Sequence, residues 1–439
     1  MGTVILLIAL LVEIGFAAYC FLTHSRQVQV RSYLWIAAFG AFVLFTLASI
    51  IRWSFRWYLL ALLLLVWAMI SVWRLFRKRA EAKPFSSVRT IFGTVGSLLL
   101  LFIALLPVLI FPQFTLPKPT GKYEVDTATF TYTDENRIET FTNNGEKRKV
   151  NVEFWYPKGA QGPYPLVLFS HGTGGIKTSN TSTFIDLASN GYVVGSLDHP
   201  YHSLFTIGSD GKLVRIDSGY WQEYMNMVNH RVDAAMRYQL TQKWLALRTA
   251  DMNFVVDTIL AQVQTNNTDA LYRLIDPTKI GLIGHSIGGA ESAQVARERS
   301  DIGAVINLDG DLFGEYVKFE NGAEVLNDKP YPVPILNIYA DDMKRGLDAI
   351  PNAKDIVAAE HVLTTAPHGY DVYLPGTNHF SLTDLALASP FVVSRMTSVV
   401  PGAGGGSTAP YETIEKMNKL VLQFFNLYLK GEGTFAGDM

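Results

Sequence analysis

The chain has 439 residues, with 37 Lys and Arg against 39 Asp and Glu and a formal net charge of −2. This balance excludes the broad basic surface with which nucleic-acid-binding proteins neutralise phosphates. The single cysteine, Cys20, excludes an internal disulfide framework and a zinc–thiolate cluster. Because the length exceeds that of one average domain, two regions are expected.

Four apolar segments open the chain, and each approaches the roughly 20 residues that span a hydrocarbon core. They are residues 4–23, 33–51, 57–73 and 91–111. We therefore expect residues 1–112 to form a transmembrane region with four helices. Glu13 lies inside the first segment, where a charge that faces lipid is costly. We expect its side chain to face another helix or to lie near the outer surface.

The loop between the third and fourth segments sets the expected orientation in the membrane. Its charged residues are Arg74, Arg77, Lys78, Arg79, Lys83 and Arg89 against one acid, Glu81. The positive-inside rule places such a loop in the cytoplasm. We therefore expect a multi-pass protein of the cell membrane, with everything after Pro112 on the extracytoplasmic side. The loop with Arg52 and Arg56 is then outside, which is a mild conflict with the rule.

A proline-stiffened linker at 113–122 leads to a region with the composition of a soluble domain, residues 123–439. Antiparallel strands are expected at 123–132 and 148–156, and buried strands at 165–170, 191–197, 280–283, 304–308 and 333–339. Helices are expected at 182–189, 251–264 and 414–430. This alternation is typical of an α/β fold with a mostly parallel sheet flanked by helices. The stretch 201–248 departs from it.

The sequence Gly-His-Ser-Ile-Gly-Gly at 284–289 follows an apolar strand and precedes an Ala-rich helix at 290–298. That context is typical of the nucleophile elbow of the α/β-hydrolase fold. We expect the turn to hold Ser286 Oγ above the edge of the sheet, with the N–H of Ile287 facing a developing oxyanion. The alternative is an ordinary glycine-rich turn.

A serine nucleophile needs a base, and the base needs an acid that holds its tautomer. In this fold the order along the chain is serine, acid, histidine. His379 follows a strand-like run that ends in Pro-Gly and is the favoured base, with His368 as the alternative. Asp309 and Asp341 each follow a buried strand. Asp309 is expected to be the more buried and is favoured, and Asp341 stays an alternative.

The second oxyanion donor is expected in the sequence His-Gly-Thr-Gly-Gly at 171–175, which follows an apolar strand. The N–H of Thr173 is favoured, and that of Gly172 is the alternative.

Two other pairs of polar residues are expected to have structural roles. His199 and His202 are expected to be structural or to line the pocket. Arg248 and Asp251 are expected to form an ion pair at the start of helix 251–264.

Four stretches carry a resemblance to a known family: residues 152–157, 168–172, 284–289 and 307–310. With them, most of 120–439 resembles the platelet-activating-factor acetylhydrolase family and related α/β-hydrolases. The resemblance implies that the nucleophile is Ser286, the acid Asp309 and the base His379, and that the backbones of Thr173 and Ile287 form the oxyanion hole. The family's acid follows the sixth strand, which favours Asp309 over Asp341.

The leading prediction is a membrane-anchored serine hydrolase of carboxylic esters, short-acyl or lipid-like, of the phospholipase A2 or acetylhydrolase type. Its Ser-His-Asp triad would act through an acyl-enzyme, with no metal and no organic cofactor. The expected partners are a small ester or lipid substrate and the membrane, and no nucleic acid. One alternative is a serine peptidase on the same fold. Another is a non-catalytic membrane sensor that retains the hydrolase fold.

Overall fold

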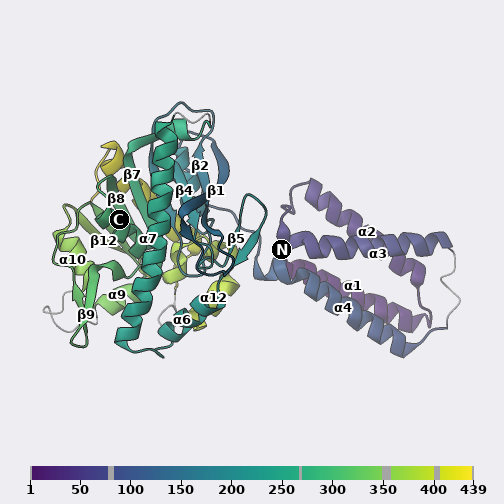
Figure 1. The fold of residues 1–439 in the computed structure, drawn as a ribbon. Helices are drawn as coiled ribbons and strands as arrows, with labels where there is room; N and C mark the ends of the chain where they lie inside the picture. The colour runs from purple at the N-terminus through teal and green to yellow at the C-terminus, as the bar shows by residue number, and fades with distance from the viewer. Residues whose placement is uncertain (1, 78–83, 266–268, 349–356, 400–405, 438–439) are drawn as a thin grey trace. The chain divides into compact units, whose positions relative to one another are not determined.

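The computed structural model describes residues 2–77, 84–265, 269–348, 357–399 and 406–437. The chain divides into two compact units, which are described separately (Figure 1). The helical unit comprises residues 1–115 with 388–392, and the α/β unit comprises 116–387 with 393–439. The first boundary falls within the linker predicted at 113–122. Three basic residues of the predicted cytoplasmic loop, Lys78, Arg79 and Lys83, lie outside the described residues.

The helical unit consists of four long helices, one for each apolar segment of the sequence. They are α1 (Gly2–Leu22), α2 (Val28–Leu47), α3 (Tyr58–Arg77), preceded by the 3-10 turn η1 (Phe55–Trp57), and α4 (Ser87–Ile110). Each is long and apolar enough to cross a membrane, by length and composition. Leu60, Leu64 and Leu105 are buried between the helices, whereas large apolar side chains such as Leu47 and Phe92 are exposed. An apolar exterior of this kind suits a lipid environment.

Glu13 faces another helix, as expected from the sequence. Its side chain is almost fully buried, and Arg31 of α2 donates from Nη2 to Glu13 Oε2 at 3.0 Å. The sequence pattern placed Arg31 in a connecting loop. In the structure it belongs to the first turns of α2, and its long side chain reaches the acid from there.

The α/β unit is built on an eight-stranded sheet in the order β1-β2-β4-β3-β7-β8-β11-β12. β2 pairs antiparallel with β1 and β4, and the remaining pairs are parallel. The strands are β1 (Val125–Ile138), β2 (Lys147–Pro157), β3 (Tyr164–Ser170), β4 (Val193–Asp198), β7 (Ile275–His285), β8 (Ile302–Leu308), β11 (Ile335–Tyr339) and β12 (Gly369–Tyr373). The predicted mostly parallel sheet is therefore confirmed.

Successive residues of the strands point to opposite faces of the sheet, so each face has its own core. In β3, Leu166 and Leu168 pack on the face covered by α7 (Ala234–Gln264) and α8 (Ile287–Glu298). Val167 and Phe169 pack on the other face, under helices α5 (Thr181–Ser189) and α13 (Pro410–Phe425). Figure 1 shows α7 running across the sheet.

Shorter elements connect these layers. They are β5 (Phe205–Ile207), β6 (Leu213–Arg215), α6 (Ser218–Val228), η2 (Tyr272–Leu274), η3 (Phe313–Glu315), β9 (Tyr316–Glu320), β10 (Ala323–Leu326), α9 (Asp341–Asp348), α10 (Ala358–Thr365), η4 (His379–Leu382), α11 (Leu385–Ala388), α12 (Pro390–Val399) and the π-helical turn η5 (Asn426–Lys430). Among them, β5, β6 and α6, with the first half of α7, fill the stretch 201–248 that departs from the alternation.

The helix predicted at 251–264 is much longer in the structure, because α7 begins at Ala234. Asp233 caps its first turn, with the carboxylate accepting from the N–H of Met236 at 2.7 Å. Arg248 and Asp251 therefore lie in the middle of a helix and not at its start, and the predicted ion pair between them is not the interaction that either makes. Their partners come from other strands and helices.

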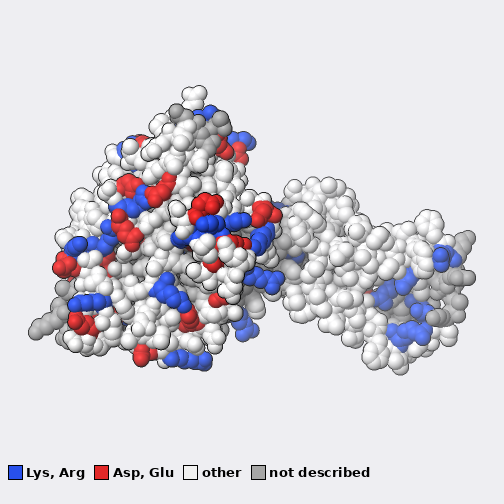
Figure 2. Space-filling view, in the orientation of Figure 1, with Lys and Arg blue, Asp and Glu red and all other residues white. Residues whose placement is uncertain are grey.

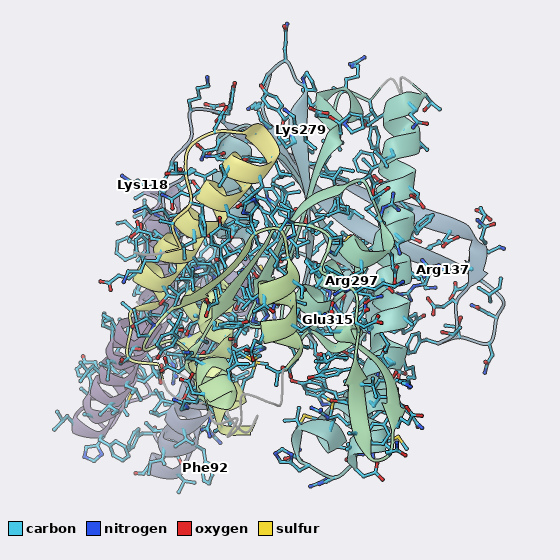
Figure 3. The ribbon with its side chains drawn as sticks, turned by 90° about the vertical axis from the view of Figure 1, so that its left-hand side faces the viewer. Phe92, Lys118, Arg137, Lys279, Arg297 and Glu315 are labelled. Atoms are coloured by element: carbon cyan, nitrogen blue, oxygen red, sulfur yellow. The ribbon has the colours of Figure 1, made fainter. Side chains whose placement is uncertain are left out.

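A bidentate ion pair ties α8 to the segment that follows β8. Arg297 of α8 donates to both carboxylate oxygens of Glu315 at 2.6 Å, and Figure 3 shows the two labelled side chains next to each other. Glu315 is almost fully buried. Since α8 begins directly after Ser286 and β8 ends directly before Asp309, this pair holds together the two segments on which the predicted site depends.

Candidate active site

Ser286 occupies a strained turn between β7 and α8. Its backbone angles are φ 56° and ψ −127°, a conformation that side-chain-bearing residues rarely adopt and that recurs at functional sites. The turn is tight because Gly284 and Gly288 touch, and a Cβ on Gly284 would overlap the carbonyl of Gly288. The Ser286 N–H donates to Leu308 O of β8 at 2.9 Å. Ser286 is only half-buried, although the residues on both sides of it are buried.

His379 and Asp309 form a direct hydrogen bond, with 2.7 Å between His379 Nδ1 and Asp309 Oδ2. The Asp309 side chain is 2% exposed, and its second oxygen accepts from the N–H of Ala340 at 2.8 Å. His379 begins η4, where Asn378 accepts the N–H groups of Phe380 and Ser381 in a capping box. Its side chain is 23% exposed. The acid is thus fixed and buried, while the imidazole reaches the surface.

His285, which precedes Ser286, makes a hydrogen bond to the backbone of His379. His285 Nε2 lies 2.8 Å from His379 O, and the two imidazole rings are 4.5 Å apart. Burial and the neighbouring His379 lower the pKa of His285 to about 3, so it is neutral and donates its Nε2–H to the carbonyl. Asp309 lies on the same edge because β7 and β8 pair with His285 opposite Leu308. Ser286, His379 and Asp309 therefore converge at the carboxyl edge of the sheet.

The two alternatives suggested by the sequence lie elsewhere. His368 precedes β12 and its carbonyl accepts from Ile335, the first residue of β11, so it lies at the amino edge of the parallel sheet. Asp341 accepts from Tyr373 Oη at 2.8 Å and from the N–H of Gly376 at 2.9 Å. Those contacts hold the loop after β12 and leave Asp309 as the partner of the histidine.

The glycine-rich loop after β3 lies directly against Ser286. A Cβ on Gly172 would be 3.1 Å from Ser286 Cβ and 2.9 Å from His285 Nδ1, so the loop could not approach this closely with a larger residue. Thr173 Oγ1 lies 3.0 Å from Tyr220 Oη of α6. In the part of the chain that the structure describes, no hydrogen bond uses the N–H of Thr173. Ile287 is the first residue of α8, where N–H groups lack a partner within the helix.

The stretch 201–248 packs over this loop. Tyr220 and Trp244 form a buried cluster with Ile287, and His202 stacks on Tyr220 with 3.7 Å between ring centroids. His202 is therefore a packing residue beneath α6, in agreement with the structural role expected from the sequence. Trp221 stays partly exposed beside Gly174.

A network of fully buried charges lies beneath the loop, and sequence reasoning did not identify it. Arg248 of α7 donates from Nη1 to His171 O at 2.6 Å, which supports the backbone immediately before Gly172. The same guanidinium lies 3.6 Å from the carboxylate of Glu291 on α8. Glu291 Oε2 accepts from Ser170 Oγ at 2.5 Å. All four residues are inaccessible to solvent, so this network can position the loop but cannot touch a substrate.

His199 and Asp251 extend this network. His199 Nδ1 lies 3.0 Å from Asp251 Oδ2, and His199 Nε2 lies 3.1 Å from Ser170 Oγ. Burial opposes charge on His199, but Glu291 and Asp251 outweigh burial and raise its pKa. Arg148 of β2 forms a bidentate pair with Asp251 at 3.1 and 2.6 Å, and despite burial it holds the pKa of Asp251 well below its usual range.

The described residues contain no group of three or more His, Cys, Asp or Glu side chains that could hold a metal ion.

Comparison with known proteins identifies the family of the α/β unit. The family described as platelet-activating factor acetylhydrolase, isoform II, matches residues 126–436. The chain belongs to this family. The resemblance expected from the sequence is thereby confirmed, and the family is named for a hydrolase, which agrees with the predicted enzyme class.

Relatives with a curated description are similar over parts of their length. The platelet-activating factor acetylhydrolase of Bos taurus is 28% identical over 182 residues, 40% of this chain and 40% of its own length. That of Cavia porcellus is 22% identical over 304 residues, which are 65% of this chain and 62% of the relative. That of Canis lupus familiaris is 29% identical over 154 residues, which are 33% of this chain and 35% of the relative. Each alignment thus spans less than two thirds of the relative.

A solved structure shows the same fold. The ferulic acid esterase from Streptomyces cinnamoneus superposes with a TM-score of 0.53 at 22% sequence identity, covering 73% of this chain and 94% of the esterase chain. Together with the family match, this likeness confirms the predicted α/β-hydrolase fold, preceded by an N-terminal region of four apolar helices.

Proposed function

We propose that the chain is a membrane-anchored serine hydrolase that cleaves carboxylic esters, with Ser286 as nucleophile, His379 as base and Asp309 as the acid that orients the base. One observation carries the proposal. At 2.7 Å, the His379–Asp309 hydrogen bond stands beside a serine in a strained and partly exposed turn. Membership of an acetylhydrolase family supports the reaction type, and supports a short-acyl or lipid-like ester as substrate.

The reaction begins with attack of Ser286 Oγ on the ester carbonyl carbon, while His379 Nε2 takes the hydroxyl proton. Asp309 keeps the Nδ1 proton in place and stabilises the imidazolium that forms. The carbonyl π electrons move to oxygen, and the resulting oxyanion accepts from the N–H groups of Thr173 and Ile287. One such donor typically contributes on the order of 10²–10³ in rate.

The tetrahedral intermediate then collapses. The bond from carbon to the alkoxy oxygen breaks, and the alcohol leaves with the proton from His379, which gives an acyl-Ser286 ester. A water molecule, deprotonated by His379, adds to this ester. The second collapse releases the carboxylic acid and returns the proton to Ser286 Oγ. No step requires a metal or an organic cofactor.

The four apolar helices support the membrane part of the proposal. Large apolar side chains are exposed along them, among them Leu11, Leu44, Leu47, Phe76 and Phe92. We place the ends with Arg74 and Arg89 in the cytoplasm by the positive-inside rule, and the chain after α4 on the extracytoplasmic side. Arg56, on the opposite side of the membrane in this orientation, donates to Pro112 O at 2.7 Å. A structural contact of this kind accounts for a basic residue outside the cytoplasm.

The test uses the full chain purified in detergent, with p-nitrophenyl acetate and a series of p-nitrophenyl esters of increasing acyl length. Ser286→Ala should lower turnover by on the order of 10⁴-fold or more. Ser292→Ala is the matched control. It lies on α8, and its hydroxyl donates only to Gly288 O, so it should retain turnover. A fluorophosphonate probe should label Ser286 in the wild type. Retained turnover in Ser286→Ala, or a label on another serine, would contradict the proposal.

A further inference from the structure

The helical unit contains a cavity of about 770 Å³ at one end of its helices. All of its arginines lie where α1 and α3 end and where α2 and α4 begin, so residues from four helices and their connections share one mouth. The arginines that line it are Arg26, Arg31, Arg74, Arg77 and Arg89. No acidic side chain lines it among the described residues. Figure 2 shows Lys and Arg atoms gathered at this end of the helical unit.

The positive charge of the cavity is compensated only in part. Arg31 is paired with Glu13 and also donates to Ser97 Oγ at 2.6 Å. The guanidinium of Arg77 lies over the ring of Trp73 at 4.6 Å, a contact that leaves its charge in place. Within the described ranges, no carboxylate pairs with Arg26, Arg74 or Arg89. In the α/β unit, by contrast, buried arginines such as Arg148 have carboxylate partners.

The interior of the cavity differs from its mouth. The wall extends along α4 from Arg89 to Ser97, which at about 1.5 Å per residue is roughly 12 Å into the helix. Trp35 and Trp67 line this deeper part, with their ring centroids 4.1 Å apart. The cavity therefore combines three guanidinium groups that have no carboxylate partner among the described residues with an aromatic wall of Trp35 and Trp67, and the contact between Arg31 and Ser97 lies at its deeper end.

We propose that this cavity binds one anionic phospholipid, with the phosphate of the headgroup at Arg26, Arg74 and Arg89 and an acyl chain against Trp35 and Trp67. A guanidinium group can donate two parallel hydrogen bonds to two oxygens of one phosphate. Basic groups at the cytoplasmic ends of membrane helices also attract anionic lipids. Free phosphate offers the same oxygens but would leave the aromatic wall unfilled. The proposal rests on the membrane embedding proposed above and is independent of the esterase chemistry.

The experiment is native mass spectrometry of the full chain in detergent, in the Ser286→Ala background, so that no bound lipid can be hydrolysed. The probes are dioleoyl phosphatidylglycerol, dioleoyl phosphatidylcholine and inorganic phosphate. We expect retention of phosphatidylglycerol over phosphatidylcholine, and no displacement of the lipid by phosphate. Arg74→Gln and Arg89→Gln should each weaken phosphatidylglycerol binding about fivefold. Arg52→Gln, the same charge change on the exposed connection between α2 and α3, should leave it unchanged.

Three outcomes would overturn the proposal. They are equal retention of the two lipids, a loss in Arg52→Gln as large as that in Arg89→Gln, and displacement of the lipid by inorganic phosphate alone. Thermal unfolding in detergent should be the same for Arg74→Gln, Arg89→Gln and Arg52→Gln, which shows that the variants fold. Because lipid retention and ester turnover are separate measurements, failure of one proposal does not hide the fate of the other.

Discussion

The described residues of the α/β unit include two serine–histidine–aspartate arrangements, and they differ chiefly in access to solvent. In one, His379 Nδ1 is 2.7 Å from Asp309 Oδ2, and Ser286 lies at the same edge of the sheet. In the other, His199 Nδ1 is 3.0 Å from Asp251 Oδ2, and its Nε2 is 3.1 Å from Ser170 Oγ.

The buried arrangement has both hydrogen bonds, from histidine to aspartate and from serine to histidine, whereas among the described residues of the exposed one only the His379–Asp309 bond is formed. His199, Asp251 and Ser170 are nevertheless almost fully inaccessible, and the nearby charges of Arg148 and Glu291 are buried with them. A hydroxyl in such a place meets no ester and no water. The comparison teaches that triad-like hydrogen bonds alone do not mark a catalytic site. A partly exposed serine in a strained turn, next to the N–H of Thr173, which makes no hydrogen bond within the described residues, distinguishes the arrangement at Ser286.

Substituting each of the two histidines in turn gives the strongest test of this comparison. His379→Gln should lower kcat by on the order of 10⁴-fold or more, because the serine loses its base, with little change in Tm. His199→Gln should destabilise the fold by about 3 kcal/mol, because buried charges lose a partner, and folded molecules should keep most of their turnover. Ester turnover and thermal unfolding measure the two effects. If His199→Gln abolished turnover with an unchanged Tm, the assignment of the two arrangements would be reversed.

The two acids suggested by the sequence can be separated in the same way. Asp309→Asn should lower kcat by roughly 10⁴-fold, since an amide cannot hold the required tautomer of His379. Asp341→Asn is the matched control, because Asp341 follows the neighbouring strand β11 and accepts from Tyr373 and Gly376 instead. It should keep turnover close to that of the wild type. A larger loss of kcat in Asp341→Asn than in Asp309→Asn would favour Asp341 as the acid that orients His379.

The buried network should reveal itself mainly in stability. Glu291→Gln removes the carboxylate beside Arg248 and should destabilise the α/β unit by about 3 kcal/mol. Arg248 supports the carbonyl before Gly172, so kcat should fall while KM changes little. Glu298→Gln on the exposed side of the same helix is the control and should have little effect on Tm or kcat. Equal Tm values for the two variants would mean that the network contributes no net stability.

The last expected effect concerns pH. The pKa of His285 is lowered to about 3 in the folded state, whereas an unfolded histidine titrates near its ordinary value of about 6.5. Its neutral form therefore contributes stability that is present above about pH 6.5 and is lost as the pH falls toward 3, by up to about 1.4 kcal/mol per pH unit. His285→Gln keeps a donor for His379 O but cannot titrate. Thermal unfolding between pH 7 and 4 should show a shallower decline for this variant, and parallel declines would exclude His285 as the source.

Local patterns in the sequence were sufficient for the fold of the α/β unit and for the family. The apolar strand, the turn at 284–289 and the helix after it are contiguous, and the fold class follows from that order. The roles of Ser286, Asp309 and His379 remain predictions that the experiments above must decide, although the structure brings the three residues to one edge. Between Asp309 and Asp341 the choice depended on which acid the loop after β12 uses for its own hydrogen bonds.

The buried network could not be predicted, because its partners are far apart in the chain. Arg148 and Asp251 are separated by 103 residues, and Ser170 and Glu291 by 121. Of these charges, only Arg248 and Asp251 were interpreted from the sequence, as an ion pair at the start of a helix. For Arg248 the interpretation failed for a second reason, since the expected start of the helix lay well after the true start of α7 at Ala234. Had the helix been predicted at its full length, Arg248 would have stood out as a charged residue in the middle of an apolar helix face.

The pairing of β7 with β8 also constrains how this domain can change in length. Gly284 lies opposite Asn307 and His285 opposite Leu308, so Ser286 and Asp309 are the residues that directly follow the last pair of the ladder. Inserting a single residue into β8 would turn the carboxylate to the opposite face of the sheet. The stretch 201–248 lies outside the eight-stranded sheet, so it can lengthen or shorten without disturbing that pairing. We therefore expect related chains to vary in the stretch that corresponds to 201–248, and so in the esters they admit, while the spacing from residue 286 to residue 309 stays constant.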